Sequence, residues 1–223
     1  MAKYKIIEVK ESIFKGNEIE ADALRDKLKK QKCCLINVMS SPGSGKTTFL
    51  ISLINKLKSK YRIGVMEADI DSDVDTSSIV KSTGVKAIQI HTGGACHLTA
   101  SMTNESINQF DISNLDLILL ENVGNLVCPA EFDTGSHYNL CLLSVPEGDD
   151  KPLKYPLMFE VSNIVCITKI DTLNYFDFSL DKVKKNIKLR NKTADIFNVS
   201  AKNNIGMDEV SKYLEDKINQ IIR

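Results

Sequence analysis

Residues 40–47, with the sequence SSPGSGKT, combine glycine, lysine and threonine in a spacing that suits phosphate binding. Gly43 and Gly45 let backbone N–H groups turn inward without a clash at Cβ, and the N-terminus of a following helix adds partial positive charge. Lys46 can reach the β- and γ-phosphates of a nucleotide, and the Thr47 hydroxyl can bind Mg²⁺. The expected nucleotide contacts are Gly43, Ser44, Gly45, Lys46, Thr47 and Thr48, with Lys46 also catalytic.

The flanking sequence supports this interpretation. An apolar strand over residues 34–39 precedes the segment, and a helix over residues 46–59 follows it. A glycine-rich turn that binds nothing is the alternative, and the coincidence of strand, GSGKT and helix disfavours it. Ser40 stands where such loops usually begin with glycine, so this position bears on nucleotide affinity.

Acidic side chains follow the next predicted strand, at Glu67, Asp69, Asp71, Asp73 and Asp75. Strand ends meet at one edge of a parallel sheet, where ligands bind. Asp69 is therefore a candidate Mg²⁺ ligand, and Asp75, in an expected switch loop, could orient the attacking water. A solvated acidic loop with helix caps is the alternative for all of them, and it is favoured for Asp71 and Asp73.

Glu121-Asn122-Val123-Gly124 comes directly after an apolar strand and matches the DxxG element of GTPases, with Glu in place of Asp. The Glu121 carboxylate can hold Mg²⁺, directly or through water. Gly124 lets the backbone approach the γ-phosphate. The position after a hydrophobic strand gives these four residues their weight.

Thr168-Lys169-Ile170-Asp171 resembles the NKxD element with which GTPases recognise guanine. A carboxylate at Asp171 can accept two hydrogen bonds from guanine N1–H and N2–H, a donor pair that adenine lacks. The aliphatic stem of Lys169 would cover the base, while Thr168 replaces the usual Asn. Lysine and aspartate at a strand end can also be an ordinary turn. The SAK sequence at Ser200, Ala201 and Lys202 follows in the order expected of a base site, and together the two elements favour GTP over ATP.

Cys96, His97 and Cys128 form a third constellation, because thiolate and imidazole are preferred ligands of Zn²⁺ and Ni²⁺. Adjacent Cys and His cannot share a helix face, so they would act from a loop or a helix cap. Three ligands leave a tetrahedral site short, unless water or a second subunit completes it. The alternative is two buried thiols and a capping histidine. The other cysteines are expected in strand cores: Cys33, Cys34, Cys141 and Cys166.

Apolar segments alternate with helical ones along the 223 residues, which fits one α/β domain. We predict a three-layer P-loop NTPase fold with a mostly parallel central sheet and helices on both faces. The predicted strands are 34–39, 62–66, 86–90, 116–120, 140–145, 164–168 and 195–199, and a last helix runs over 207–222.

The charge balance and the absence of targeting signals bear on the partners and the location of the protein. Acidic and basic residues balance at 29 each, which predicts no attraction to nucleic acid or anionic lipid. No apolar run approaches the ~20 residues of a membrane span. Residues 1–10 lack the apolar core of a signal peptide, so a cytoplasmic protein is expected.

Residues 10–32 predict a charged amphipathic helix whose buried stripe comprises Ile13, Ile19, Ala23, Leu24 and Leu28. We expect it to be an N-terminal helical extension over residues 1–32, packed on a GTPase domain over residues 33–223.

Several motifs together resemble the hydrogenase nickel-incorporation GTPases, the HypB family. They are NVMSSPGSGKTT, EADIDSDVD, IHTGGACHL, LLENVGNLVCPAEFDTG, PEGDDKPLKYPLMF and ITKID. The resemblance implies a SIMIBI-class P-loop GTPase that forms a homodimer with GTP and holds Zn²⁺ or Ni²⁺ at the dimer interface, on Cys96, His97 and Cys128. Lys151 and Lys154 are expected near the nucleotide at or across that interface, or are solvated loop lysines.

The implied role is placing nickel in [NiFe]-hydrogenase, together with a HypA-type nickel chaperone and the hydrogenase large-subunit precursor. Many bacterial relatives carry an N-terminal CxxCGC motif, and some carry a His-rich tract. Residues 1–32 contain neither Cys nor His, so only the GTPase-linked metal site is expected. Three alternatives are an ATP-dependent small-molecule kinase on the same fold, a related GTPase serving urease, and a non-catalytic metal-binding regulator.

Overall fold

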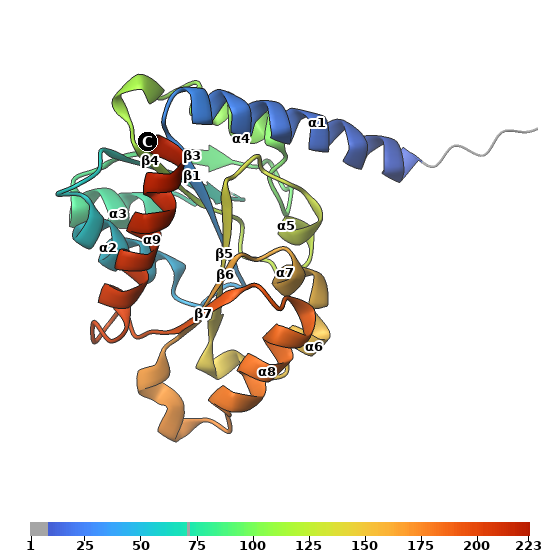
Figure 1. Cartoon of the computed structure of the whole chain (residues 1–223), viewed down its shortest axis with the longest axis vertical. Coiled ribbons are helices and arrows are strands. Elements are labelled where there is room, and N and C mark those ends of the chain that lie inside the picture. Colours follow the sequence, from blue (N-terminus) through green and yellow to red (C-terminus); the bar gives the residue numbers. More distant parts are fainter. Residues whose placement is uncertain (1–8, 71) are drawn as a thin grey trace, which may run out of the picture.

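A single seven-stranded sheet organises the chain in the computed structural model, which describes residues 9–70 and 72–223, with side chains from residue 14 onward (Figure 1). The strands are β1 (Cys34–Ser40), β2 (Ile63–Asp69), β3 (Lys86–His91), β4 (Leu117–Glu121), β5 (Tyr138–Ser144), β6 (Ile164–Thr168) and β7 (Asp195–Asn198). Their order is β3-β2-β4-β1-β5-β6-β7, and every pairing is parallel. The predicted strands are all confirmed, and the mostly parallel sheet proves parallel throughout.

Helices connect the strands as parallel pairing requires. They are α1 (Val9–Lys30), α2 (Lys46–Leu57), α3 (Val74–Thr83), α4 (Ala100–Ile107), α5 (Cys128–Glu131), α6 (Lys151–Lys154), α7 (Pro156–Glu160), α8 (Leu180–Arg190) and α9 (Met207–Ile222). Short 3₁₀ helices lie at η1 (Ile112–Asn114), η2 (Val145–Glu147) and η3 (Ile170–Tyr175). Among the described residues, no helix has the length and apolar character needed to cross a bilayer.

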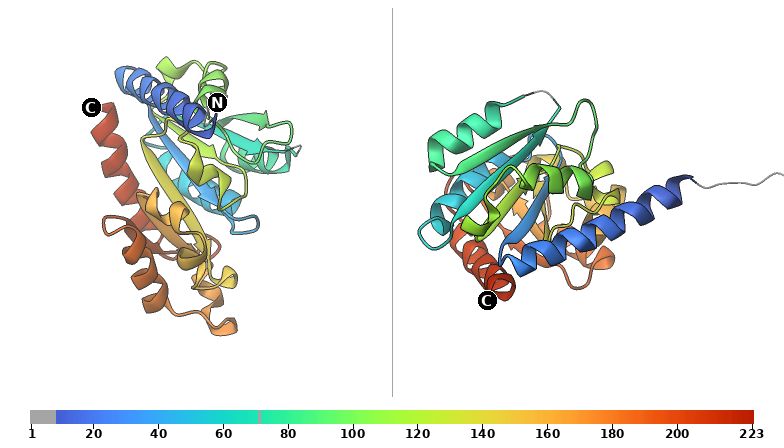
Figure 2. Two further views of the ribbon diagram at one scale, coloured as in Figure 1. Left: turned by 90° about the vertical axis from the view of Figure 1, so that its right-hand side faces the viewer. Right: turned by 90° about the horizontal axis from the view of Figure 1, so that it is seen from above.

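The alternation of side chains along each strand divides the hydrophobic core between the two faces of the sheet, with one cluster on one face and two on the other. On β1, Ile36 and Val38 face α2 and α9, whereas Leu35 faces the opposite layer. On β6, Cys166 and Val165 divide in the same way. The result is the predicted three-layer arrangement, in which α2, α3 and α9 cover one face and α1, α4, α7 and α8 cover the other (Figures 1 and 2).

The predicted buried stripe of the N-terminal helix is partly wrong. Leu24 and Leu28 are buried as expected, but Ile19 is 65% exposed and Ala23 is also exposed. The buried face instead runs through Asn17, Ala21, Leu24 and Leu28, so a polar residue occupies a position that an apolar pattern cannot reveal. The side chain of Ile13 lies outside the described residues.

The cysteines expected in strands are confirmed as core residues, since Cys33, Cys34, Cys141 and Cys166 are fully buried. Burial raises the pKa of each of these thiols. They therefore behave as small apolar side chains and are poor candidates for metal ligands.

His137, the residue before β5, bonds to β1 through its ring. Its Nδ1 accepts a hydrogen bond from the Leu35 N–H at 3.0 Å, and its Nε2 has no partner among the described residues. Burial and the nearby Arg25 charge lower the pKa of His137 from its ordinary 6.5 to about 4. The ring is therefore neutral in the folded protein down to about pH 4.

We expect His137 to make stability depend on pH. Between pH 6.5 and 4 the unfolded chain binds a proton at this ring that the folded chain does not, so stability falls as the pH drops through this window. The half-buried ring should contribute about 1–2 kcal/mol at most. Urea unfolding at pH 7 and pH 4.5 should show a smaller loss for His137→Gln than for the wild type. His91→Gln, at an exposed histidine, is the matched control, and an unchanged loss in His137→Gln would contradict the prediction.

Candidate nucleotide and metal sites

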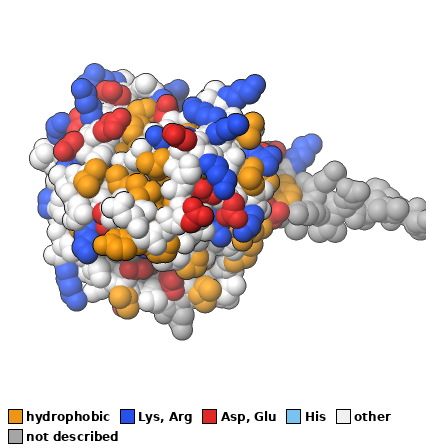
Figure 3. Space-filling model, turned by 90° about the horizontal axis from the view of Figure 1, so that it is seen from below, with side chains coloured by type: hydrophobic (Ala, Val, Ile, Leu, Met, Phe, Trp, Pro, Cys, Tyr) orange, Lys and Arg blue, Asp and Glu red, His pale blue; other side chains and the backbone are white. Residues whose placement is uncertain are grey.

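The carboxyl ends of the strands gather the predicted site residues at one edge of the sheet. β1 pairs with β4 on one side and with β5 on the other. The loops that follow these strands therefore diverge at the carboxyl end of β1, which is where ligands bind in parallel sheets. Hydrophobic, acidic and basic side chains are interspersed on the face seen from below in Figure 3. No single charge dominates that face.

The loop after β1 has the backbone that phosphate binding requires. Gly43 and Gly45 have φ angles of 73° and 96°, in the left-handed region that favours glycine. Helix α2 then begins at Lys46, with Gly45 as its N-cap and no side chain capping it. The first N–H groups of α2 are therefore available to an anion, which completes a cradle for phosphate.

Ser40 explains how this loop tolerates the missing first glycine. The Ser40 side chain is fully buried beneath the loop. Its hydroxyl accepts hydrogen bonds from Ser44 Oγ at 2.5 Å and from Lys46 Nζ at 3.1 Å, and donates to the Ser41 carbonyl at 2.8 Å. The serine thus holds the loop and the lysine in place.

Three carboxylates lie beside Thr47. Ligand oxygens of Glu67, Asp75 and Glu121 all lie within 4.8 Å of one another. The Thr47 hydroxyl is 2.8 Å from Asp75 Oδ1 and 3.5 Å from Glu121 Oε1. A hydroxyl and carboxylates are the oxygen ligands that a hard cation such as Mg²⁺ prefers.

The protonation of these carboxylates supports a cation site. Burial raises the pKa of Glu67 to about 7 and that of Glu121 to about 8, although Lys46 opposes the shift at Glu121. Glu121 Oε2 is buried with no hydrogen-bond partner among the described residues. A divalent cation would supply the missing partner and favour the ionised carboxylates, so the residues fit Mg²⁺.

The loop after β2 differs from expectation in two respects. Asp75 lies in the first turn of α3, so its placement in a switch loop was wrong. Asp69 lines the same cavity as Lys46 and Glu121, but its Oδ1 accepts the Ser72 N–H at 2.9 Å and it lies outside the close carboxylate group. Glu67 was not predicted as a ligand, although its place in a strand between apolar residues was a signal. Asp73 is exposed at the N-cap of α3, and Asp71 lies outside the described residues.

Gly124 approaches the phosphate loop directly. A Cβ built on Gly124 would lie 3.1–3.2 Å from atoms of Pro42, which is shorter than an ordinary van der Waals contact. The N–H of Asn125 donates to the Ser40 carbonyl at 2.9 Å. The segment after β4 is therefore in contact with the phosphate loop at residues 124 and 125.

The predicted base-recognition residues line one cavity. The residues that line it come from the phosphate loop and α2, from the end of β6 and the segment after it, and from the segment after β7: Gly45, Thr48, Phe49, Thr168, Lys169, Asp171, Thr172, Ser200, Ala201 and Lys202. Thr168 donates its hydroxyl to the Ser44 carbonyl at 2.9 Å, and Lys169 Nζ lies 2.6 Å from the Gly43 carbonyl. Threonine in place of asparagine thus still connects this strand end to the phosphate loop.

Cys96, His97 and Cys128 converge on a separate site. One ligand atom from each lies within 4.8 Å of the others, and Cys96 Sγ is 3.8 Å from His97 Nδ1. Cys96 and His97 lie in the loop after β3, as expected, and Cys128 is the first residue of α5. All three are half-buried, so an ion can reach them.

The electrostatics of this site fit a soft divalent cation. A hydrogen bond to Cys128, together with burial, raises the pKa of Cys96. Burial lowers the pKa of His97, which favours the neutral imidazole that metals bind. A cation between the sulfurs would stabilise both thiolates.

The two lysines predicted near a dimer interface are the first and last residues of α6. Lys154 forms an ion pair with Asp150 at 2.6 Å. Lys151 Nζ lies 5.8 Å from the centroid of the Tyr155 ring. Their proposed contacts to a nucleotide remain a prediction.

The parallel sheet, the phosphate loop and the base cavity define a P-loop nucleotide-binding protein. The family model CobW/HypB/UreG, nucleotide-binding domain, matches residues 34–198. A Helicobacter hepaticus protein, Hydrogenase/urease maturation factor HypB, is 41% identical over 217 residues, covering 96% of this chain and 88% of that protein. The chain belongs to the HypB family.

Solved structures agree with this assignment. HypB from Helicobacter pylori in complex with nickel has a TM-score of 0.86 and 38% identity, covering 92% of this chain and 96% of that chain. Hydrogenase maturation factor HypB from Archaeoglobus fulgidus has a TM-score of 0.84 and 34% identity, covering 91% of this chain and 98% of that chain.

Proposed function

We propose that this protein is a GTP-hydrolysing metallochaperone that controls nickel delivery during maturation of [NiFe]-hydrogenase. One observation carries the proposal: a short continuous segment joins the nucleotide site to the Cys96, His97 and Cys128 site. It leaves β4 at Glu121, contacts the phosphate loop at Gly124 and reaches Cys128 at the start of α5. The family and the nickel complex of the Helicobacter pylori relative support the same role.

The hydrolytic roles fall on residues at the sheet edge. Lys46 neutralises the β- and γ-phosphate oxygens, and the N–H groups of the loop and α2 orient them. Asp75, beside the Thr47 hydroxyl, orients the attacking water. Thr47, Glu121 and Glu67 would hold Mg²⁺, and Asp69 lines the same cavity outside the close carboxylate group. When bound, Mg²⁺ contributes positive charge to the phosphate oxygens as negative charge develops there.

Guanine selection rests on Asp171, whose carboxylate lines the base cavity. Asp171→Asn replaces one acceptor oxygen by a donor, so it should lower GTP affinity by about ten- to a hundredfold, as expected for losing a charged hydrogen bond, while changing ATP affinity little. Competition of GTP and ATP against a fluorescent guanine nucleotide measures the ratio. Asp181→Asn, at an exposed acid of α8, is the matched control. An unchanged GTP to ATP ratio in Asp171→Asn would refute this role.

The cargo site suits nickel delivery because its ligands are few and accessible. Two thiolates and one imidazole leave coordination positions open to water, a second subunit or a receiving protein. The same donors bind Zn²⁺, so either ion is a reasonable occupant. We assign as partners a HypA-type nickel chaperone and the hydrogenase large-subunit precursor, acting in the cytoplasm.

GTP should bring two copies together. Lys151 and Lys154 lie in α6, which follows the carboxyl end of β5, and a second subunit could bring them to the phosphates. Light scattering should show a monomer mass with GDP and about twice that mass with a non-hydrolysable GTP analogue. A monomer at saturating analogue would contradict the dimer while leaving nucleotide and metal binding untouched.

A further inference from the structure

Helix α1 contacts both chain segments that carry the metal-site residues. On one side it packs along α4, which follows the Cys96-His97 loop, as Figures 1 and 2 show. On the other side, Arg25 forms a bidentate ion pair with Asp133, which lies in the segment that follows Cys128. The two N–O distances are 2.9 and 2.8 Å. A helix outside the nucleotide-binding core thus connects two segments that are distant in sequence.

Asn17 makes this connection with a single side chain. The residue is only 7% exposed, on the buried face of α1. Its Oδ1 accepts the Ala100 N–H at 2.9 Å, and its Nδ2 donates to the Asp133 carbonyl at 2.8 Å. Both ends of the amide are therefore used, each by the backbone of a different segment.

These two backbone groups lie close in sequence to the metal-site residues. Ala100 is three residues after His97, and Asp133 is five residues after Cys128. Phe132, next to Asp133, stacks on the His97 ring with centroids 3.8 Å apart and an interplanar angle of 11°. The ring of Phe14, from α1, lies 5.0 Å from Phe132 on centroids. A shift of Asp133 relative to Ala100 would therefore change where the imidazole and the thiolates meet.

We infer that Asn17 is a positioning residue for the metal site: its amide fixes the distance between the Cys96-His97 loop and the Cys128 segment. The inference rests on the proposed role of these three residues as metal ligands. An amide is suited to the task because one end donates and the other accepts, with fixed geometry. Groups that orient metal ligands without touching the metal typically change affinity by about 10–100-fold.

The test compares Asn17→Asp and Asn17→Ala with the wild type in the full chain. Asn17→Asp keeps the acceptor for Ala100 but loses the donor to Asp133, and Asn17→Ala loses both. We expect Ni²⁺ affinity, measured by competition with a chromophoric chelator, to fall by about 10–100-fold in both variants. The thiolate-to-nickel charge-transfer absorption should also change in shape, while affinity for a fluorescent guanine nucleotide stays the same.

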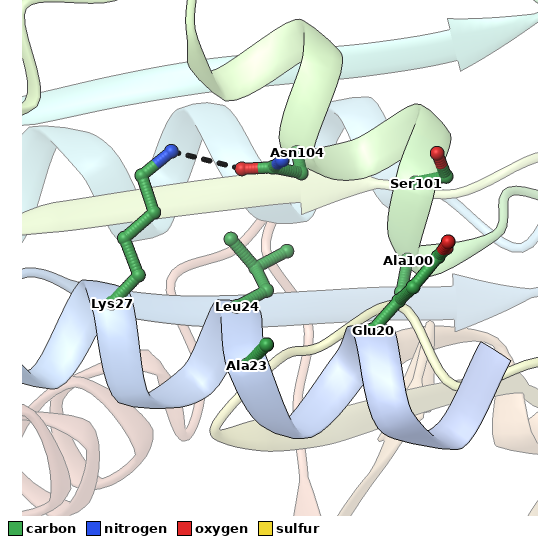
Figure 4. Close-up of a pocket in the computed structure, with 7 residues that line it drawn as sticks. All are labelled: Glu20, Ala23, Leu24, Lys27, Ala100, Ser101 and Asn104. Atoms are coloured by element: carbon green, nitrogen blue, oxygen red, sulfur yellow. Dashed lines mark hydrogen bonds between the residues drawn. The ribbon is translucent and has the colours of Figure 1, made fainter. Parts of the chain in front are cut away.

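Two controls separate positioning from general loss of α1 packing. Leu28→Ala removes a fully buried side chain of α1 and should lower stability to urea without changing Ni²⁺ affinity or the spectrum. Lys27→Ala removes the hydrogen bonds from Lys27 to Asn104 and Asn108, which lie between α1 and α4 and away from Asn17; Figure 4 shows the Lys27–Asn104 bond. This variant should also lower stability without changing Ni²⁺ affinity or the spectrum.

The outcomes are distinguishable. If Ni²⁺ affinity falls equally in Leu28→Ala and the Asn17 variants, α1 acts only through stability and the inference is wrong. If folded Asn17 variants bind Ni²⁺ with wild-type affinity and spectrum, the inference is also wrong, although the metal site stands. If the wild type itself binds no Ni²⁺ at these thiols, the proposed function fails first.

Discussion

Lys46→Ala is expected to abolish GTP turnover and to weaken nucleotide binding strongly. Lys46 Nζ is held by the Ser40 hydroxyl at 3.1 Å, so its ammonium group is already placed at the phosphate loop. Removing it leaves the β- and γ-phosphate charge uncompensated as charge shifts in the transition state. Loss of one such preorganised donor typically costs about 10²–10³-fold in turnover, and a charged donor at phosphate should reach at least this range.

Phosphate release under single-turnover conditions measures this effect, and nucleotide affinity is measured separately by fluorescence. Lys56→Ala is the matched control, because Lys56 lies on the same helix and forms a surface pair with Asp208. Such pairs contribute little, so that variant should hydrolyse GTP normally. Wild-type turnover in Lys46→Ala would show that the phosphate loop does not act as assigned.

The fold could be predicted from the sequence because each strand, helix and loop is indicated by residues that are close together in the chain. The strands read as apolar runs, and the phosphate loop leads into a helix whose apolar face is regular. The departures at Ser40 and Thr168 did not obscure the motifs. The structure adds why they are tolerated: each hydroxyl makes a hydrogen bond that holds the loop.

The remaining features depend on contacts between distant segments. Glu67 looks like part of a strand, and only the packing of β2 against β4 brings it to Glu121. In the sequence, Asn17 has the character of a solvent-exposed residue of an amphipathic helix. Its hydrogen bonds are made to Ala100 and Asp133, which lie 83 and 116 residues away. Periodicity assigns polar residues to the surface by default, which is why the buried stripe of α1 was partly wrong.

Replacement of Cys128 is expected to disrupt both metal binding and its coupling to nucleotide. Gly124 abuts Pro42, Asn125 N–H bonds to the Ser40 carbonyl, and the Asn125 side chain accepts the Val127 N–H at 2.8 Å. A γ-phosphate that moves the loop or Gly124 would therefore move Cys128 through this short, bonded segment. A displaced sulfur changes ligand number or angle, to which Ni²⁺ and Zn²⁺ respond differently.

Calorimetric titration of Ni²⁺ with GDP or a GTP analogue bound measures both effects. In the wild type, the two nucleotide states should differ by ~1–3 kcal/mol in metal affinity, and metal must change nucleotide affinity by the same factor. Cys128→Ala should lower Ni²⁺ affinity by about a hundredfold or more, since loss of a ligand exceeds the cost of losing an orienting group. It should also abolish the difference between nucleotide states while leaving GTP affinity intact, whereas Cys141→Ala, at a fully buried core thiol, should change neither. Equal Ni²⁺ affinity in the GDP and GTP-analogue states of the wild type would contradict the coupling, even if all three ligands are correct. If the segment from Gly124 to Cys128 moves with the γ-phosphate, the sulfur of Cys128 must move as well, and the affinity for Ni²⁺ must change.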